Sequence, residues 1–136
     1  MRRHVLYLSF LVALVVAGCD DNMLNPSDIK EVTWKLEAIE RAGSPTIQVP
    51  DPEVYTLILG NNGGITVRAD CNRCTTTYTL SGDTVKSGHL DCTTNFCTLA
   101  SLDGNYAAAL EGDSTISISE SHLLLRRGAV TLRFRN

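Results

Sequence analysis

The sequence predicts an α+β domain in which a curved, barrel-like antiparallel sheet carries one helix. Short segments that alternate apolar and polar residues lie on both sides of a single helical segment, so the order is strands, helix, strands rather than βαβ. Alternation of this kind is typical of antiparallel sheets with one wetted face. At 136 residues the chain has the length of one domain.

The first 18 residues have the pattern of an export signal. Arg2 and Arg3 form a basic start, residues 5–17 are almost all apolar, and small residues precede Cys19. The apolar run is short for a membrane span. The pattern resembles the lipobox of bacterial lipoproteins, which implies cleavage before Cys19, lipid attachment there, and a place in the bacterial cell envelope facing the periplasm or the cell exterior. The alternatives are an ordinary secretory signal with an incidental cysteine, or an uncleaved anchor.

The domain organisation follows from this leader. Residues 1–18 are the predicted signal peptide, 19–29 the lipidated cysteine with a polar tether, and 30–136 the folded domain. Removing the leader lowers the count of Lys and Arg from 12 to 10 against 15 Asp and Glu, a formal net charge of −5. We therefore expect no nucleic-acid binding, membrane attachment through the N-terminal lipid alone, and an envelope protein as candidate partner.

Strands are predicted on the N-terminal side of the helix. Residues 32–39 alternate with period two, which puts Trp34 in the core rather than on a ligand platform. An Asn-Gly turn at residues 60–64 favours a tight hairpin. The further strands expected here cover residues 54–59, 65–69, 75–80 and 84–90.

A loop is predicted between the first two strands. Residues 41–52 hold Gly43, Pro45, Pro50 and Pro52, which break regular structure. Loops on a rigid β-domain are suited to contact a partner. The candidate binding residues in this loop are Gly43, Pro45, Gln48 and Pro50.

The helix is predicted after Cys97. Leu99, Leu102, Tyr106 and Leu110 recur at helical spacing, with Thr98 as the N-cap and Gly112 as the stop. Three short alternating strands are then expected at residues 115–119, 122–126 and 129–134.

Four cysteines, Cys71, Cys74, Cys92 and Cys97, lie close together in the sequence. Because an exported protein folds where thiols oxidise, two disulfides are favoured. A four-cysteine zinc site is the alternative, although the spacing from Cys92 to Cys97 is long for a zinc knuckle. A redox dithiol at Cys71 and Cys74 is a further alternative, but no suitable helix follows it.

Four cysteines allow three pairings. The local pairing, Cys71 with Cys74 and Cys92 with Cys97, would close two very short loops and would not link segments distant in the sequence. The crossed pairing, Cys71 with Cys92 and Cys74 with Cys97, does not match the register of antiparallel segments. The nested pairing, Cys71 with Cys97 and Cys74 with Cys92, suits antiparallel segments best, because the paired residue numbers have nearly the same sum.

Several motifs follow one another in a fixed order between residues 32 and 134. They are Trp34-x-Leu36, Cys71-Asn72 followed by Tyr78, Thr93-x3-Cys97, a helix with Tyr106 and Leu110, and Leu132-x-Phe134. This order resembles the META domain family, which includes the HslJ-like bacterial lipoproteins. The chain departs from the family pattern at Asp70 and Thr76, where the family has glycine, and at two additional cysteines. Cys71 and Cys97 match the two cysteines of the family pattern, whereas Cys74 and Cys92 are additional. The resemblance therefore implies the same nested pairing.

The resemblance implies an antiparallel, barrel-like fold with one helix, no known catalytic site, and a link to envelope stress and drug tolerance in bacteria. We expect a non-catalytic cell-envelope lipoprotein without a cofactor. An inhibitor or partner-binding domain is the alternative, and an enzyme or zinc-binding protein the third reading. His89 and Asp91 are near the cysteines, but no nucleophile accompanies them, so a surface polar pair is expected. His122 is expected to be an isolated, solvent-facing residue.

Overall fold

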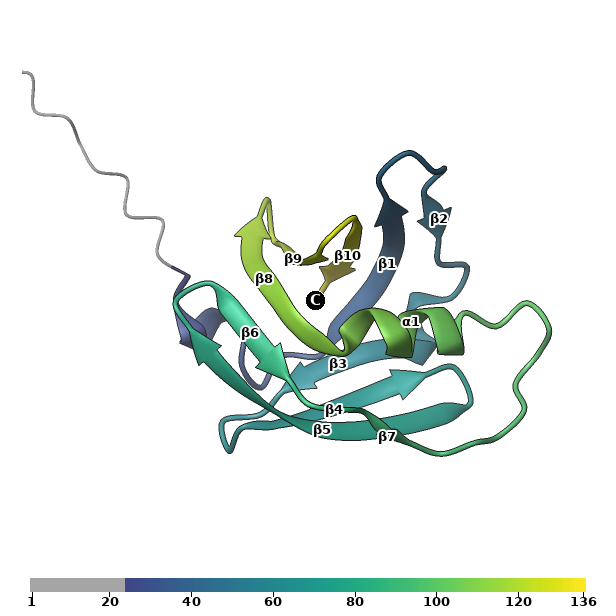
Figure 1. The fold of residues 1–136 in the computed structure, drawn as a ribbon, viewed down its shortest axis with the longest axis horizontal. Helices are drawn as coiled ribbons and strands as arrows, with labels where there is room; N and C mark the ends of the chain where they lie inside the picture. The colour runs from purple at the N-terminus through teal and green to yellow at the C-terminus, as the bar shows by residue number, and fades with distance from the viewer. Residues whose placement is uncertain (1–23) are drawn as a thin grey trace, which may run out of the picture.

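The computed structural model describes residues 24–136; the predicted signal peptide and Cys19 lie outside this range. The described part contains strands, one α-helix and two 3₁₀ turns (Figure 1). In chain order they are η1 (Pro26–Asp28), β1 (Trp34–Arg41), β2 (Ile47–Gln48), η2 (Pro52–Val54), β3 (Tyr55–Leu59), β4 (Gly64–Ala69), β5 (Asn72–Ser81), β6 (Thr84–Ser87), β7 (Asp91–Cys92), α1 (Asp103–Leu110), β8 (Gly112–Ser119), β9 (His122–Arg127) and β10 (Val130–Arg135).

Eight strands form a closed antiparallel barrel. Going round the barrel, the order is β1, β3, β4, β5, β6, β8, β9 and β10, and β10 then pairs with β1. The short strands β2 and β7 add to β1 and β5. Closure gives each long strand a neighbour on both sides, which removes the exposed edges of an open sheet. The predicted α+β fold, a barrel-like antiparallel sheet with one helix, is confirmed.

The interior of the barrel is filled by side chains. Leu36, Leu57, Leu132 and Phe134 come from the strands and are fully buried. Tyr106 enters from α1, and its ring centroid lies 6.1 Å from that of Phe134. The interior of an eight-stranded barrel is just wide enough for its own side chains or for one small ligand. Here the buried side chains of the strands and of α1 occupy the interior.

The two ends of the barrel are covered by different segments. At one end, α1 buries Tyr106 and Leu110. We call this the loop end, because it also carries residues 42–46, 70–71 and 93–102. The other end is covered by residues 24–31, the strap, and carries the turns at residues 60–63, 82–83 and 120–121. In Figure 1 the strap lies on the left and the segment between β7 and α1 extends to the right.

The strap differs from the predicted tether at residues 19–29. Ile29 is 0% exposed, and its carbonyl accepts a hydrogen bond of 2.9 Å from Trp34 Nε1. Leu24 packs against the core, and Glu31 N donates to Leu59 O at 2.9 Å. Residues 24–29 therefore belong to the packed domain, because Ile29 supplies an apolar side chain that closes the barrel.

Strand β1 departs from the predicted alternation. The register against β10 shifts between Leu36 and Ala38, which marks a β-bulge. Because a bulge adds one residue to one strand, the side-chain pattern changes face beyond it. Ala38 and Ile39 are accordingly both buried, whereas strict alternation puts Ile39 on the outer face.

The helix begins later than predicted. It starts at Asp103 with Leu102 as N-cap, Thr98 does not cap it, and Leu99 is 97% exposed instead of lying on a buried helix face. The preceding residues are held in a non-helical conformation by Cys97, as described below. The predicted stop at Gly112 follows the last helical turn, with a φ of +92° that favours glycine.

Replacing Tyr106 with phenylalanine is expected to raise the free energy of unfolding by about 1 kcal/mol. The Tyr106 hydroxyl is buried without a hydrogen-bond partner in the described part of the chain, and burial raises its pKa well above the ordinary value. Chemical denaturation of Tyr106→Phe measures the change. The control is Tyr55→Phe, which should be destabilised because Tyr55 Oη accepts from Leu102 N at 3.0 Å. Loss of stability in Tyr106→Phe would show that this hydroxyl has a partner, such as an internal water.

Candidate functional site

Two disulfides lie at the loop end of the barrel. Cys71, in the β4–β5 turn, is bonded to Cys97 with a Cα–Cα distance of 5.5 Å. Cys74 of β5 lies directly opposite Cys92 of β7 and is bonded to it. This is the nested pairing that the sequence favours. Within residues 24–136, no group of three or more His, Cys, Asp or Glu is placed to hold a metal ion.

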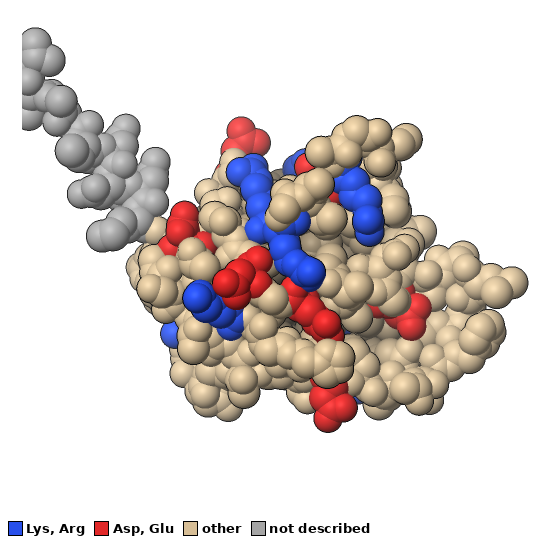
Figure 2. All heavy atoms as spheres, in the orientation of Figure 1, with Lys and Arg blue, Asp and Glu red and all other residues tan. Residues whose placement is uncertain are grey.

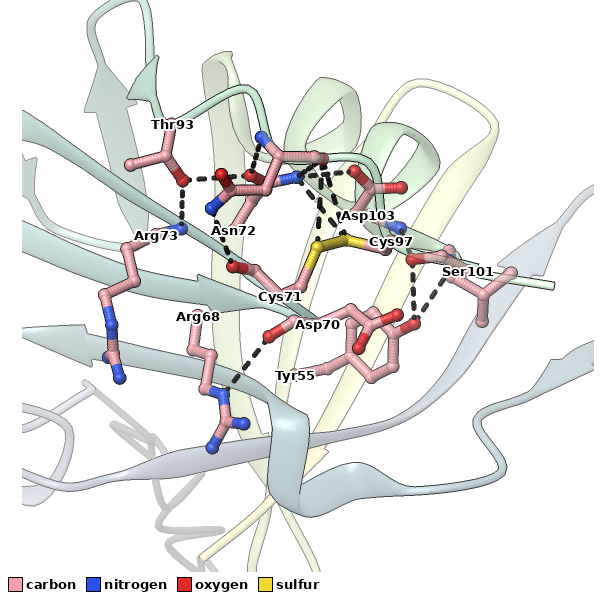
Figure 3. The surroundings of a disulfide bond; sticks show 12 residues. Tyr55, Arg68, Asp70, Cys71, Asn72, Arg73, Thr93, Cys97, Ser101 and Asp103 are labelled. Carbon is pink, nitrogen blue, oxygen red and sulfur yellow. Dashed lines mark hydrogen bonds between the residues drawn. A yellow bond between two sulfur atoms is a disulfide. The ribbon is translucent and has the colours of Figure 1, made fainter. Parts of the chain in front are cut away.

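Asn72 connects the disulfide to the following chain (Figure 3). Its side chain is 5% exposed. Its Oδ1 accepts from Asn95 N at 2.8 Å and from Thr93 Oγ1 at 2.9 Å. Its Nδ2 donates to Asn95 O and to Asp103 Oδ2, both at 3.0 Å. All four hydrogen-bonding positions of one buried amide are thus used to hold residues 93–103 against β5.

The turn that carries Cys71 explains one departure from the family pattern. Asp70 has a φ of +58° between the paired residues Ala69 and Asn72. Glycine adopts this left-handed conformation most easily, and aspartate tolerates it better than most residues. Arg68 Nε donates to the Asp70 carbonyl at 3.2 Å and supports the turn.

Sequence reasoning missed the role of Asn72 and the conformation of residues 93–102, here called the 93–102 loop. The signal for Asn72 was its place in the matched Cys-Asn motif, but a polar residue in such a motif does not reveal its partners. Further contacts fix the two ends of the loop. Arg73 N donates to Thr93 Oγ1 at 3.0 Å, and Leu102 N donates to Tyr55 Oη at 3.0 Å.

The predicted binding loop lies at the same end of the barrel. Gly43, Pro45, Gln48 and Pro50 are all exposed. The segment is not entirely a loop, however, because Ile47–Gln48 forms β2 and pairs with β1. Val49 is buried, which anchors the loop to the core.

His89 pairs with Glu111 rather than with Asp91. His89 Nδ1 lies 2.9 Å from Glu111 Oε1, and the same oxygen accepts from Leu90 N at 3.0 Å. Asp91 lies on β7 opposite Thr75. Both side chains are exposed, so the arrangement matches surface polar residues.

The prediction that His122 is isolated is wrong. Its Nε2 lies 3.1 Å from Glu37 Oε2, and the side chain is partly buried. Glu37 also faces Arg133 and Arg135, whose Nε atoms are 3.8 and 3.4 Å away. Pairing of β1 with β10 closes the barrel and brings these residues together. The sequence around His122 gives no sign of this pairing, because Glu37 lies far away along the chain.

A second carboxylate extends this group of charges. Glu53 lies 2.9 Å from Lys35 and 3.6 Å from Arg135, and its hydrogen bond from Lys35 lowers its pKa. Exposed ion pairs of this kind contribute little to stability. On the face shown in Figure 2, acidic and basic side chains are intermixed.

Two smaller surface hollows adjoin this group of charges: one of about 300 Å³ is lined by Glu37 and Arg133, and one of about 180 Å³ by His122 and Arg133. Two larger hollows lie away from it. One hollow of about 450 Å³ lies at the strap end, between the strap and β8. Another of about 450 Å³ lies over β5 and β6. Neither is lined by a histidine or a cysteine. Among residues 24–136, no helix has the length and apolar character needed to cross a membrane.

Comparison with known families gives a match over most of the chain. A model of the META domain matches residues 27–136. The chain belongs to the META domain family. The match begins inside η1, so it includes most of the strap as well as the barrel. META domains are generally non-catalytic.

Solved structures share the META domain's fold. An NMR structure of a protein from Burkholderia xenovorans is 21% identical with a TM-score of 0.66, and the match covers 99% of this chain and 97% of that one. A second NMR structure is 21% identical with a TM-score of 0.62, covering 83% and 95%. The crystal structure of a lipocalin-like protein from Bacteroides uniformis is 18% identical with a TM-score of 0.53, covering 80% and 98%. These low identities establish the fold alone, and no curated protein matches the chain.

Proposed function

We propose that this META domain is a non-catalytic, lipid-anchored domain of the bacterial cell envelope that binds a partner protein and acts in envelope stress or drug tolerance. One observation carries the proposal. The barrel interior is filled by its own side chains and both ends are covered, by the strap and by α1. Recognition must therefore use the outer surface and the loops.

The disulfides and the strap support the envelope location. Disulfides persist in oxidising compartments such as the periplasm or the cell surface. Cys19 precedes Leu24, the first residue of the strap, by five positions. A lipid on Cys19 would therefore hold the strap end of the barrel close to the bilayer.

Replacing Cys19 with serine is expected to abolish membrane attachment of the processed protein, because removal of the acylated residue removes the predicted anchor. Partition between detergent and aqueous phases, together with labelling by a fatty acid, measures this result. The matched control is Ser27→Ala, an exposed position in η1 that should partition like the wild type. If Cys19→Ser still gives a cleaved, membrane-bound product, the lipoprotein assignment is wrong.

The binding role is tested in cells that lack the protein. A strain with the gene deleted is complemented with the wild type, with a variant lacking residues 43–46, or with His89→Ala, and grown under envelope stress. We expect the loop deletion to lower tolerance and His89→Ala to complement fully. Failure of a folded His89→Ala variant to complement would contradict the non-catalytic assignment.

A further inference from the structure

Two large apolar side chains are exposed on the 93–102 loop. Phe96 is 85% exposed and Leu99 is 97% exposed. Single exposed apolar residues are common on protein surfaces, but here an aromatic and a leucine lie three positions apart on one loop. They project from the loop end of the barrel.

The loop that carries these side chains is held in place. Phe96 lies between Asn95, whose N–H and carbonyl are both bound by Asn72, and Cys97, which is disulfide-bonded to Cys71. Leu99 lies within a turn closed by a hydrogen bond of 3.0 Å from Ser101 N to Thr98 O. A loop ordered before binding loses less conformational freedom when it docks. The disulfide and Asn72 therefore present both side chains in a prepared conformation.

The charge pattern indicates the kind of partner. The 93–102 loop has no charged residue, and its flanks carry Asp91 and Asp103. The part of the molecule that projects to the right in Figure 2 is accordingly free of blue and red. The centres of protein–protein interfaces are depleted in charge and enriched in aromatic residues. Loops that bind anionic membranes carry basic residues instead, so these observations favour a protein surface.

The position of the loop favours the same conclusion. With a lipid on Cys19, the five positions from Cys19 to Leu24 span about 17 Å at most. This keeps the strap near the bilayer, and the 93–102 loop lies at the other end of the barrel (Figure 1). The loop that carries Phe96 and Leu99 would then lie on the side of the barrel away from the membrane that holds the protein.

We propose that the 93–102 loop is a docking element that inserts Phe96 and Leu99 into an apolar groove of another envelope protein. The proposal deepens the proposed function and rests on it for the role in partner binding. Asp91 favours a partner whose groove has a basic rim.

The experiment uses the full chain in living cells. A photo-crosslinking amino acid is placed at Thr98, between the two apolar side chains, or at Gln48 on the predicted binding loop. The captured protein is identified, purified and titrated with the wild type and with Phe96→Ser/Leu99→Ser. The control is Ile118→Ser, an apolar residue of β8 that is 40% exposed and lies beside Leu24 and Asn25 at the strap end. An unchanged melting temperature of Phe96→Ser/Leu99→Ser is expected for exposed positions, and a cooperative thermal transition of Ile118→Ser shows that the control also remains folded.

We expect crosslinks at Thr98 to one envelope protein, and a Kd raised at least 100-fold by Phe96→Ser/Leu99→Ser but not by Ile118→Ser. Crosslinks at Gln48 alone, or a Kd unchanged by the double variant, would overturn the docking role of this loop and leave the proposed function standing. Crosslinks at neither position would overturn partner binding through the loop end of the barrel, both by this loop and by the predicted binding loop. Binding of Cys19→Ser protein to phosphatidylethanolamine–phosphatidylglycerol vesicles, lost in Phe96→Ser/Leu99→Ser, would replace the protein partner with a membrane.

Discussion

Removing the Cys71–Cys97 disulfide is expected to lower the free energy of unfolding by about 3 kcal/mol. The two cysteines are 26 positions apart, and the chain-entropy model gives about 3.5 kcal/mol for a loop of this size. The Cys74–Cys92 bridge already restricts 18 positions of the same segment in the unfolded chain, so the loss should be somewhat smaller. Urea denaturation of Cys71→Ala/Cys97→Ala measures it.

The local effect of this change distinguishes the two disulfides. Cys97 anchors the 93–102 loop through its bond to Cys71. The backbone amide hydrogens of this loop should therefore exchange faster in Cys71→Ala/Cys97→Ala than in the wild type. The control variant is Cys74→Ala/Cys92→Ala. It should also lose stability, because Cys74 is buried in the core opposite Val67, but its 93–102 loop should stay protected. Wild-type stability and wild-type exchange in Cys71→Ala/Cys97→Ala would contradict the structural role of this bridge.

Replacing Asn72 with alanine is expected to lower the free energy of unfolding by about 3 kcal/mol. The change removes the hydrogen bonds to Thr93, Asn95 and Asp103. It also leaves polar groups at a largely buried position without partners, which costs more than the bonds themselves. Thermal and chemical denaturation measure the loss, and Thr93→Val is the milder comparison because it removes only one of these partners.

The Asn72→Asp variant keeps the shape of the side chain but changes its hydrogen bonding. Its loss of stability should also depend on pH. The new carboxylate has the size of the amide but cannot donate to Asp103 when it is ionised. Burial and the nearby Asp103 should raise its pKa in the folded state, so the folded state binds the proton more tightly than the unfolded state. The stability of Asn72→Asp relative to wild type should therefore recover as the pH falls from 7 towards 4. A constant difference over this range would show that Asp103 does not face this position.

Most strands of the barrel could be predicted from local pattern. Alternation placed Trp34 and Leu36 inward, and the same rule places Leu132 and Phe134 in the core. The bulge in β1 could not be predicted, because it depends on pairing with β10 at the far end of the chain. The helix start was missed for a similar reason, since apolar spacing from Leu99 to Leu110 fits a helix equally well whether or not a disulfide restrains Cys97.

The candidate site, too, could be predicted only in part from the sequence. The exposure of Gly43 and Pro45 follows from loop-forming residues, but the pairing of β2 with β1 does not. Asn72 was recognisable only as part of a motif. Its four hydrogen bonds arise because the β4–β5 turn and the chain after β7 meet at one end of the barrel.

The sequence by itself determined the antiparallel barrel-like class, the META resemblance and the preferred nested cysteine pairing, because these depend on residue spacing along the chain. Only the tertiary structure decided that Ile29 closes the barrel, that His122 meets Glu37, and that Phe96 and Leu99 stay outside the core. The physical reason is that burial and contact belong to pairs of distant residues. A leucine has the same local pattern whether the fold covers it or leaves it in water.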